Sequence, residues 1–185
     1  MTDSELSGGP PLAIVLMGVS GCGKSTVGAE LSRVLGWPFR DADSFHPAAN
    51  IARMSRGIPL TDADRAPWLD AIAAWIDDRL ARRTPGIVSC SALKRAYRQR
   101  IVGARSGVAL VYLEGEMALI AERLAGRRGH FMPAALLASQ FAALEEPQED
   151  ERPLVVSIEP PPAEIAARIV AGLGGLAALP GRGGG

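Results

Sequence analysis

Residues 18–25, GVSGCGKS, constrain the fold more than any other stretch of this sequence. They match the phosphate-loop pattern G-x-x-x-x-G-K-[ST], in which glycines let backbone N–H groups approach phosphate oxygens without a Cβ in the way. A glycine-rich turn before an ordinary helix is the alternative, and a bare pattern match leaves it open. The context favours the phosphate loop, because the apolar run 12–17 precedes it as a buried strand and residues 24–35 follow with helical spacing.

Strand-like and helix-like segments alternate along the whole chain. Short apolar runs predict strands, and apolar residues that recur every three or four positions predict helices. On this basis we expect strands at 12–17, 37–42, 86–90, 107–113 and 154–158, and helices at 24–35, 47–55, 64–83, 92–103, 116–126 and 163–172. Such alternation is typical of βαβ units. The sequence therefore predicts a three-layer α/β fold, a five-stranded parallel sheet with helices on both faces.

Two connecting segments, 44–63 and 127–152, are longer than ordinary connections between such elements. We interpret 44–63 as a substrate-binding segment and 127–152 as a lid region. Both belong to one predicted domain, 12–172, because a chain of 185 residues suits a single core. Residues 1–11 and the glycine-rich tail 173–185 are expected to be flexible, since glycine adds backbone entropy and buries little.

The composition argues against several classes of partner. The formal net charge is zero, so nothing favours binding to nucleic acid or to an anionic membrane. No apolar run approaches the roughly 20 residues that span a bilayer, and the acidic N-terminal stretch lacks the basic region of a secretory signal. Cys22 and Cys90 fit neither a disulfide framework nor a metal-ligand pair, so we expect reduced thiols in a cytoplasmic protein.

The phosphate loop also predicts the residues that bind a nucleotide. Lys24 can reach the β- and γ-phosphates and is predicted to act in catalysis, while the Ser25 hydroxyl can ligate Mg²⁺. Cys22 has a setting that can lower the pKa of a thiol, but a small residue tolerated in a loop is the simpler interpretation, and we assign it no catalytic role. The predicted set is Gly18, Ser20, Gly21, Cys22, Gly23, Lys24, Ser25 and Thr26.

Two carboxylates follow the second predicted strand. Asp41 and Asp43 are two residues apart, so on a strand both would project from one face into the crevice at the carboxyl end of the sheet. Beside a triphosphate, Asp41 would hold Mg²⁺ and its waters, and Asp43 would accept a proton from an attacking hydroxyl. The alternative is that Asp43 or Ser44 caps the helix at 47–55, and capping can coexist with function.

Basic residues are predicted in the same part of the fold. Arg53 lies in one predicted helix, and Lys94 and Arg98 are four apart in another, where they would share a face. Arginine binds carboxylates in a bidentate manner, so these side chains suggest a second, anionic substrate. A solvated basic surface is the alternative. His46 would bond a hydroxyl of that substrate or serve as a structural loop histidine, and the sequence leaves both open.

The stretches that carry these residues resemble the gluconate kinases (gluconokinases) of the shikimate-kinase-like branch of the P-loop kinases. The resemblance covers about residues 12–172 and rests on GVSGCGKS, HPAANIARM, PLTDADRAPWL, CSALK and RRGHFM…LLASQFAALEEPQEDE. The chain departs from the family pattern at Ala42, where Gly is usual, and at Cys22, where Ser or Thr is usual. Neither change removes a chemical group that the interpretation requires.

The resemblance implies a kinase that uses ATP and Mg²⁺ to phosphorylate the 6-hydroxyl of D-gluconate, in a P-loop kinase fold with a helical lid. It implies a cytoplasmic homodimer that acts on this small molecule, without a nucleic-acid or membrane partner. Arg123 and Arg127 would lie against adenine or the phosphates. Arg127 or Arg128 would neutralise charge on the transferred phosphoryl group, with Arg127 as the catalytic candidate. His130 would contact the gluconate.

Two other interpretations stay open. One is another small-metabolite kinase, such as a shikimate or nucleoside-monophosphate kinase. The other is a nucleotide-binding regulator that hydrolyses ATP slowly, for which a carboxylate at Asp43 would have no purpose. A GTPase or motor ATPase is disfavoured, because the strand at 86–90 ends without the aspartate that those proteins use for Mg²⁺.

Overall fold

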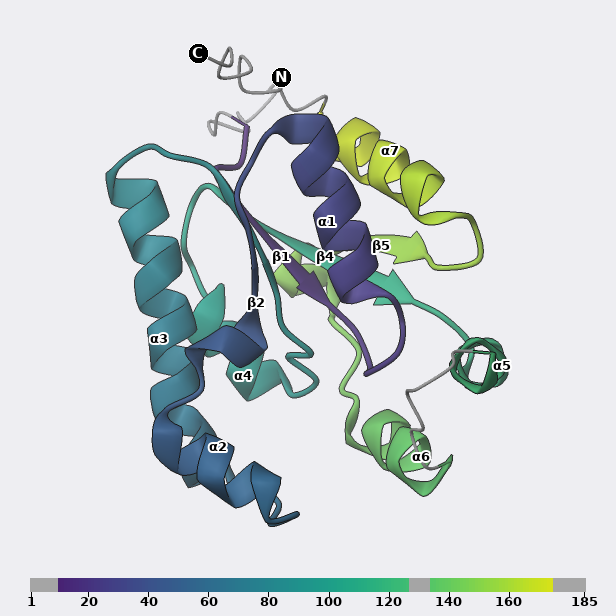
Figure 1. Cartoon of the computed structure of the whole chain (residues 1–185). Helices are drawn as coiled ribbons and strands as arrows, with labels where there is room; N and C mark the ends of the chain where they lie inside the picture. Colours follow the sequence, from purple (N-terminus) through teal and green to yellow (C-terminus); the bar gives the residue numbers. More distant parts are fainter. Residues whose placement is uncertain (1–9, 127–133, 175–185) are drawn as a thin grey trace, which may run out of the picture.

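Five parallel strands form the centre of the structure, a computed structural model that describes residues 10–126 and 134–174 (Figure 1). The strands are β1 (Ala13–Met17), β2 (Phe39–Asp41), β3 (Gly86–Ser89), β4 (Val108–Glu114) and β5 (Leu154–Ser157). Their order across the sheet is β2-β3-β1-β4-β5. β1 is therefore central, with Ala13 opposite both Gly86 and Val108, and all of its residues are buried. The predicted five-stranded parallel sheet is confirmed.

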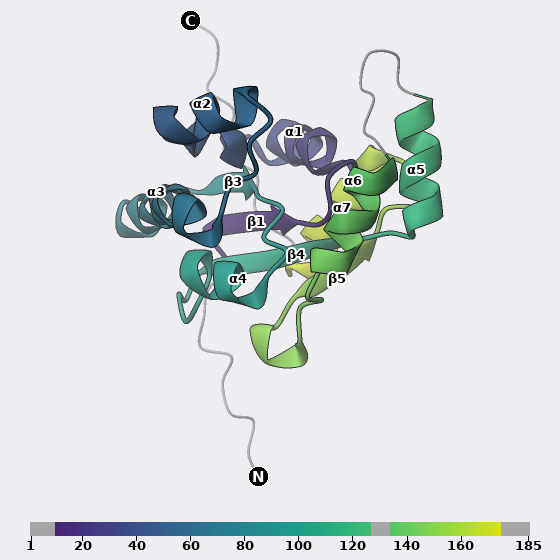
Figure 2. The same ribbon diagram turned by 90° about the horizontal axis from the view of Figure 1, so that it is seen from below.

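Helices cover both faces of the sheet (Figures 1 and 2). They are α1 (Lys24–Leu35), α2 (Ala48–Ser55), α3 (Asp62–Ala81), α4 (Arg95–Ile101), α5 (Met117–Ala125), α6 (Ala134–Ala143) and α7 (Pro162–Gly172), with the 3₁₀ helices η1 (Ala42–Phe45) and η2 (Glu149–Glu151). On one face, α1 and α7 pack in a core that contains Ile14 and Leu16 of β1. On the other face, α3 and α4 pack in a core that contains Ala13, Val15 and Met17. The three-layer α/β prediction is confirmed.

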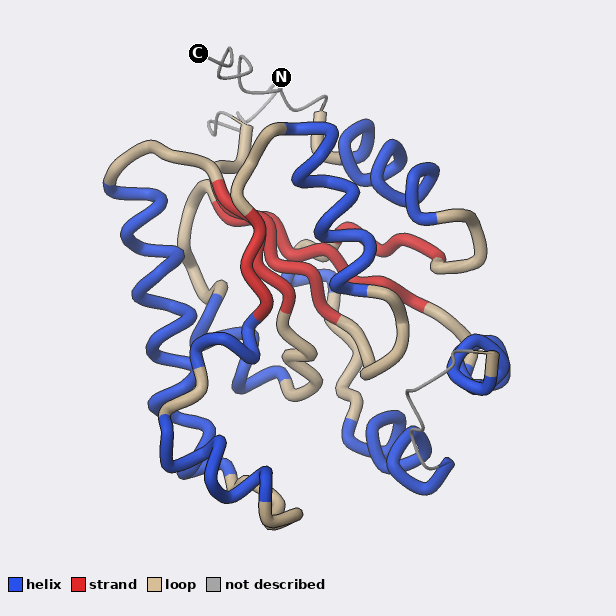
Figure 3. The backbone as a smooth tube through the Cα atoms, in the orientation of Figure 1, coloured by secondary structure: helices blue, strands red, loops and turns tan. Residues whose placement is uncertain are grey.

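All the strands of the sheet, red in Figure 3, run parallel, so their carboxyl ends lie at one edge of it. The loop at 18–23 follows β1 there, η1 follows β2, and the loop at 90–94 follows β3. Ligands of open α/β sheets bind in the crevice at this edge, beside the point where the strand order reverses. Here that point lies between β1 and β3, because the chain leaves β1 toward β2 on one side and leaves β3 toward β4 on the other.

Strand β2 is shorter than predicted, and this changes the position of Asp43. The backbone N–H of Asp43 donates to Oδ1 of Asp41 at 3.0 Å, so Asp41 caps η1 directly after the strand. Asp43 therefore lies in a 3₁₀ turn, and the prediction that both aspartates project from one strand face is wrong. The capping alternative is wrong as well, because the N-cap of α2 is Pro47 and makes no side-chain capping bond.

Three helices differ from the sequence expectation, among them α4, which is predicted at 92–103 and spans only Arg95–Ile101. α3 begins at Asp62, slightly earlier than predicted, because Thr61 and Asp64 form a capping box in which each side chain bonds the backbone of the other. α6 lies within the lid region at 127–152, for which no separate helix is predicted from the sequence. Among the helices described here, none is long and apolar enough to cross a membrane.

Candidate active site

The loop between β1 and α1 has the backbone conformation of a phosphate loop. Gly21 and Gly23 have φ angles of 86° and 100°, in the left-handed region that favours glycine. At Gly18 a Cβ would lie 2.9 Å from the carbonyl oxygen of Leu113, so the loop passes too close to β4 for a side chain there. The loop leads directly into α1, whose first N–H groups have no partner within the helix and attract anions.

Lys24 is the first residue of α1, and its side chain folds back over the loop. Its ammonium group donates to the carbonyl oxygens of Gly18 at 2.8 Å and of Val19 at 2.9 Å. The positive charge is thereby held across the phosphate loop, beside the helix end that attracts anions. This is the place predicted for the β- and γ-phosphates.

The structure brings together the two predicted Mg²⁺ ligands. Oγ of Ser25 donates to Oδ2 of Asp41 at 2.8 Å. Hydroxyl and carboxylate oxygens are hard ligands that suit Mg²⁺, and this ion usually completes its shell with water and substrate phosphates. In the described part of the chain, no group of three or more His, Cys, Asp or Glu residues could hold a metal ion. The Ser25 and Asp41 oxygens fit an ion that takes the rest of its ligands from water and phosphates.

A cavity of about 350 Å³ adjoins the phosphate loop on the α7 side. Thr26 of α1, Arg123 of α5 and the proline run at 160–162 line it, together with the loop glycines. Nη1 and Nη2 of Arg123 donate to the carbonyl oxygens of Ile158 at 2.7 Å and Glu159 at 3.1 Å. Arg123 therefore fixes the backbone that forms one wall of this cavity, which we call the nucleotide cavity.

Cys22 also lines the nucleotide cavity, but it is a buried free thiol. Burial raises the pKa of the Cys22 thiol, and this outweighs the opposing effect of the nearby Lys24 charge. The side chain therefore stays protonated at neutral pH. A packing role for Cys22 agrees with the assignment of no catalytic role.

A second cavity, of about 560 Å³, lies at the same edge of the sheet, and we call it the acceptor cavity. Of the predicted substrate residues, it contains Asp43, His46 and Lys94. Ser91, which also lines it, accepts a hydrogen bond from the Gly18 N–H through its carbonyl oxygen at 3.3 Å. The acceptor cavity therefore adjoins the phosphate loop.

His46 and Asp43 form one part of the acceptor cavity. The His46 ring stacks on Trp68, with 4.5 Å between ring centroids and 9° between planes. Nε2 of His46 lies 4.0 Å from Oδ1 of Asp43, whose side chain is 89% exposed. Burial lowers the pKa of His46, and the Asp43 carboxylate opposes this shift. A neutral imidazole therefore lies beside an accessible carboxylate.

Two cations, Lys94 and Arg65, line another part of the acceptor cavity, and both contact Asp62, which does not line it. Nζ of Lys94 lies 3.0 and 2.9 Å from the two carboxylate oxygens of Asp62. Nη1 of Arg65 lies 3.7 Å from Asp62 and donates to the Tyr97 hydroxyl at 3.1 Å. These contacts hold the Asp62 carboxyl pKa below its usual value, chiefly through hydrogen bonds from Tyr97 and Lys94. Arg53 differs, because its guanidinium lies 3.6 Å from Asp64 and does not line the cavity.

The prediction that Arg98 binds substrate is wrong. Its side chain is only 1% exposed and forms a two-pronged ion pair with Glu151, with contacts of 2.6 and 2.9 Å. Lys94 is the N-cap of α4 and Arg98 lies inside the helix, so the two do not share a helical face toward the acceptor cavity. Arg98 does not line that cavity because Glu151 holds it within the protein.

Sequence reasoning missed several residues of the acceptor cavity, among them Arg65, Trp68, Tyr97 and Gln140. Oε1 of Gln140, on α6, accepts hydrogen bonds from the Ser20 N–H and the Ser20 hydroxyl, both at 3.3 Å. Gln140 therefore joins the lid region to the phosphate loop, a contact that nothing in the local sequence signals. For Tyr97, its position three residues after Lys94 could have suggested a shared face. Arg127, Arg128 and His130 lie outside the described residues.

Three comparisons relate this arrangement to known proteins. The AAA domain family matches residues 14–147. The gluconokinase of Gluconobacter oxydans (strain 621H) is 43% identical over 171 residues, which are 92% of this chain and 96% of that protein. The crystal structure of a gluconokinase from Sinorhizobium meliloti 1021 has a TM-score of 0.76 at 49% identity, covering 88% of this chain and 91% of that one. The APS kinase CysC of Mycobacterium tuberculosis shares the fold, with a TM-score of 0.62 at 18% identity over 88% of this chain and 96% of that one.

Proposed function

Since this chain belongs to the gluconokinase family, we propose that it transfers the γ-phosphoryl group of ATP to the 6-hydroxyl of D-gluconate, giving 6-phospho-D-gluconate and ADP. One observation supports this acceptor above others. The acceptor cavity beside the phosphate loop contains both an exposed carboxylate, Asp43, and the cations Arg65 and Lys94. An acceptor with a hydroxyl at one end and a carboxylate at the other satisfies both parts.

On the nucleotide side, the proposal assigns ATP to the nucleotide cavity and the phosphate loop. Lys24 would exchange its bonds to the loop carbonyls for bonds to the β- and γ-phosphates, and Arg123 would hold the wall beside adenine. Ser25 and Asp41 would hold Mg²⁺ directly or through its waters. When bound, Mg²⁺ would supply neutralisation of the charge that develops on the phosphates.

On the acceptor side, Asp43 would accept the proton of the 6-hydroxyl and orient its oxygen toward the γ-phosphorus. His46 is neutral, so it would donate or accept one hydrogen bond to a neighbouring hydroxyl without adding charge. Its stacking on Trp68, whose Nε1 donates to the carbonyl oxygen of Ala42 at 2.7 Å, fixes the ring in place. Phosphoryl transfer depends mainly on such positioning and on charge neutralisation.

Lys94 and Arg65 would bind the gluconate carboxylate, so that their N–H donors are divided between it and the Asp62 carboxylate. Both cations lie against an exposed carboxylate already, so the pocket is suited to a second carboxylate that competes for the same donors. Arg53 would contact the substrate only after leaving Asp64. Arg127 as catalytic cation, His130 as gluconate ligand, the homodimer and the cytoplasmic location stay predictions.

D-glucose, which has the same 6-hydroxyl but no carboxylate, is expected to be a much poorer acceptor than D-gluconate. Losing a charged hydrogen bond costs about 1.5–3 kcal/mol, which corresponds to at least about tenfold in kcat/KM. A coupled assay of ADP formation with each acceptor measures the ratio. Equal kcat/KM for the two acceptors would contradict the carboxylate contact.

A variant pair locates that contact. Lys94→Met should lower kcat/KM for gluconate and leave the weak activity on glucose unchanged. The ratio of kcat/KM for gluconate to kcat/KM for glucose should therefore fall. Arg100→Met is the matched control, because Arg100 lies on α4, the helix that follows Lys94, and pairs with Asp70 away from the acceptor cavity. This control should leave the ratio as in the wild type.

A further inference from the structure

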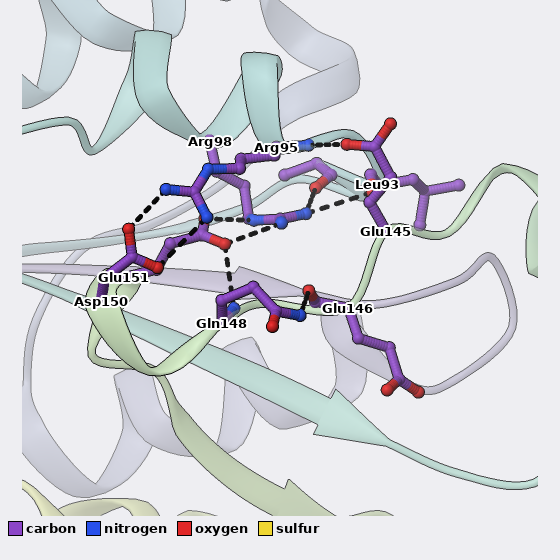
Figure 4. A network of polar contacts seen from close by, with 9 residues as sticks. Leu93, Arg95, Arg98, Glu145, Glu146, Gln148, Asp150 and Glu151 are labelled. Atoms are coloured by element: carbon purple, nitrogen blue, oxygen red, sulfur yellow. Dashed lines mark hydrogen bonds and ion pairs between the residues drawn. The ribbon is translucent and has the colours of Figure 1, made fainter.

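A buried ion pair, Arg98 with Glu151, is bonded to residues that line the acceptor cavity. Nε and Nη2 of Arg98 contact the two carboxylate oxygens of Glu151 at 2.6 and 2.9 Å. The Arg98 side chain is 1% exposed and the Glu151 side chain 9%. The pair joins α4 to η2, two elements that are far apart in the sequence (Figure 4). Neither residue has a part in the proposed chemistry.

The remaining donor of Arg98 is directed at the loop before α4. Nη1 donates to the carbonyl oxygens of Ala92 and Leu93, both at 3.1 Å. The Leu93 carbonyl also accepts from the backbone N–H of Glu145 at 2.8 Å, so Arg98 and the segment after α6 hold the same group. In Figure 4, Arg98 lies between Leu93 and Glu151.

Ala92 shows why this loop needs a fixed partner. Its φ is +44°, in the left-handed region that a residue with a Cβ rarely adopts. Such strained backbone persists only where surrounding contacts determine it, and it is concentrated at functional sites. The Arg98 bond to the Ala92 carbonyl is one such contact. Ala92, Leu93 and Lys94 all line the acceptor cavity, so the strained loop is part of its wall.

We propose that Arg98 and Glu151 are positioning residues that hold the strained loop at 92–94, and with it Lys94, in the geometry that binds the acceptor carboxylate. Glu151 neutralises and orients the guanidinium, and the guanidinium fixes the two carbonyl oxygens. This inference rests on the proposed function, since it concerns the affinity for gluconate. It assigns no substrate contact to either residue.

The alternative is that the pair only stabilises the fold. A buried ion pair is weak support for that role, because apolar residues of similar volume often replace such pairs without loss of stability. Removing one partner alone would leave a buried charge, so both charges have to be removed together. The double variant Arg98→Met with Glu151→Gln does this, and the glutamine oxygen can still accept the Gln148 N–H that Glu151 binds at 3.0 Å.

The experiment measures KM for gluconate, kcat, the ATP dissociation constant by calorimetry, and Tm. The double variant is expected to fold and to raise the gluconate KM about tenfold or more, with ATP affinity within about twofold of the wild type. Arg98→Lys keeps a charge beside Glu151 but cannot make all four bonds of the guanidinium, so it should raise the same KM. Asp150→Asn is the control, because it removes the charge and one of the two oxygens that Arg95 contacts at 3.1 and 2.5 Å, and leaves the loop carbonyls bound.

The outcomes separate the possibilities. A wild-type gluconate KM in either folded variant, with only Tm or the active fraction lowered, would overturn the positioning role. A double variant that does not fold would also overturn it, since the pair would then be needed for stability. If the gluconate KM rose equally in Asp150→Asn, the cause would be weaker packing between α4 and η2 and not the loss of the Arg98 bonds to the loop, which would also overturn the proposal. If the wild type itself does not phosphorylate gluconate, the proposed function is wrong. The ATP dissociation constants still report nucleotide binding, because calorimetry measures them independently of turnover.

Discussion

Lys24→Met is expected to lower turnover with ATP and gluconate by at least about 10²–10³-fold, the usual effect of removing one donor that stabilises charge in a transition state. The Lys24 ammonium lies across the phosphate loop, bonded to the carbonyl oxygens of Gly18 and Val19. On ATP binding the ammonium group would instead bond the β- and γ-phosphates and neutralise part of their charge. Methionine keeps most of the unbranched side chain and removes the ammonium group, with its charge and its N–H donors.

The fold should survive this change, because the target of the ammonium group is the phosphate and not the core. Circular dichroism and Tm check this directly. Arg33→Met is the matched control: it removes a cation from the same helix, where Arg33 pairs with Glu30 at the exposed surface. If Lys24→Met retained wild-type turnover, the assignment of the phosphate loop would be wrong.

Asp43→Asn is expected to lower kcat by roughly 10²–10⁴-fold, which is typical for the loss of a general base. The Asp43 carboxylate is exposed in the acceptor cavity, beside the neutral ring of His46. Asparagine keeps the shape but cannot take the proton of the acceptor hydroxyl. The KM for ATP should change little, because Asp43 does not line the nucleotide cavity.

Asp41→Asn provides the contrast to Asp43→Asn. Asp41 accepts the hydrogen bond of Ser25 at the start of α1, so its loss should raise the Mg²⁺ concentration needed for activity. Steady-state kinetics with Mg²⁺ and gluconate varied separately distinguishes the two variants. If they exchanged these phenotypes, the roles of the two aspartates would be reversed. If neither variant lost activity, the two aspartates would have only a structural role, the cap of η1 that the Asp43 N–H and the Asp41 side chain form.

The parts of the fold that depend on local pattern could be predicted from the sequence. The buried run that became β1, the glycines of the phosphate loop and the stripe of α1 are each set by neighbours in the chain. They placed Lys24 and Ser25 correctly at the start of α1. The prediction that Asp43 lies on the strand was wrong for a local reason. The Asp41 side chain accepts the hydrogen bond of the Asp43 N–H, and the strand ends there.

Other errors came from contacts between distant parts of the chain. Helical spacing suggested that Arg98 shares a face with Lys94, but the burial of Arg98 depends on Glu151, which lies 53 residues away. Gln140 reaches Ser20 across 120 residues, and only the packing of α6 against the phosphate loop reveals it. Sequence spacing describes one helix or strand at a time, so it could not supply either contact.

The most direct test of the proposed reaction is identification of the product formed by the wild-type chain from ATP, Mg²⁺ and D-gluconate. Phosphorus and proton NMR of the reaction mixture reports which hydroxyl carries the new phosphate, while ADP is measured in the same sample. We predict one phosphorylated gluconate for each ADP, with the phosphorus coupled to the two protons on carbon 6. ADP formed without phosphorylated gluconate, or phosphate attached to another hydroxyl, would contradict the proposed function.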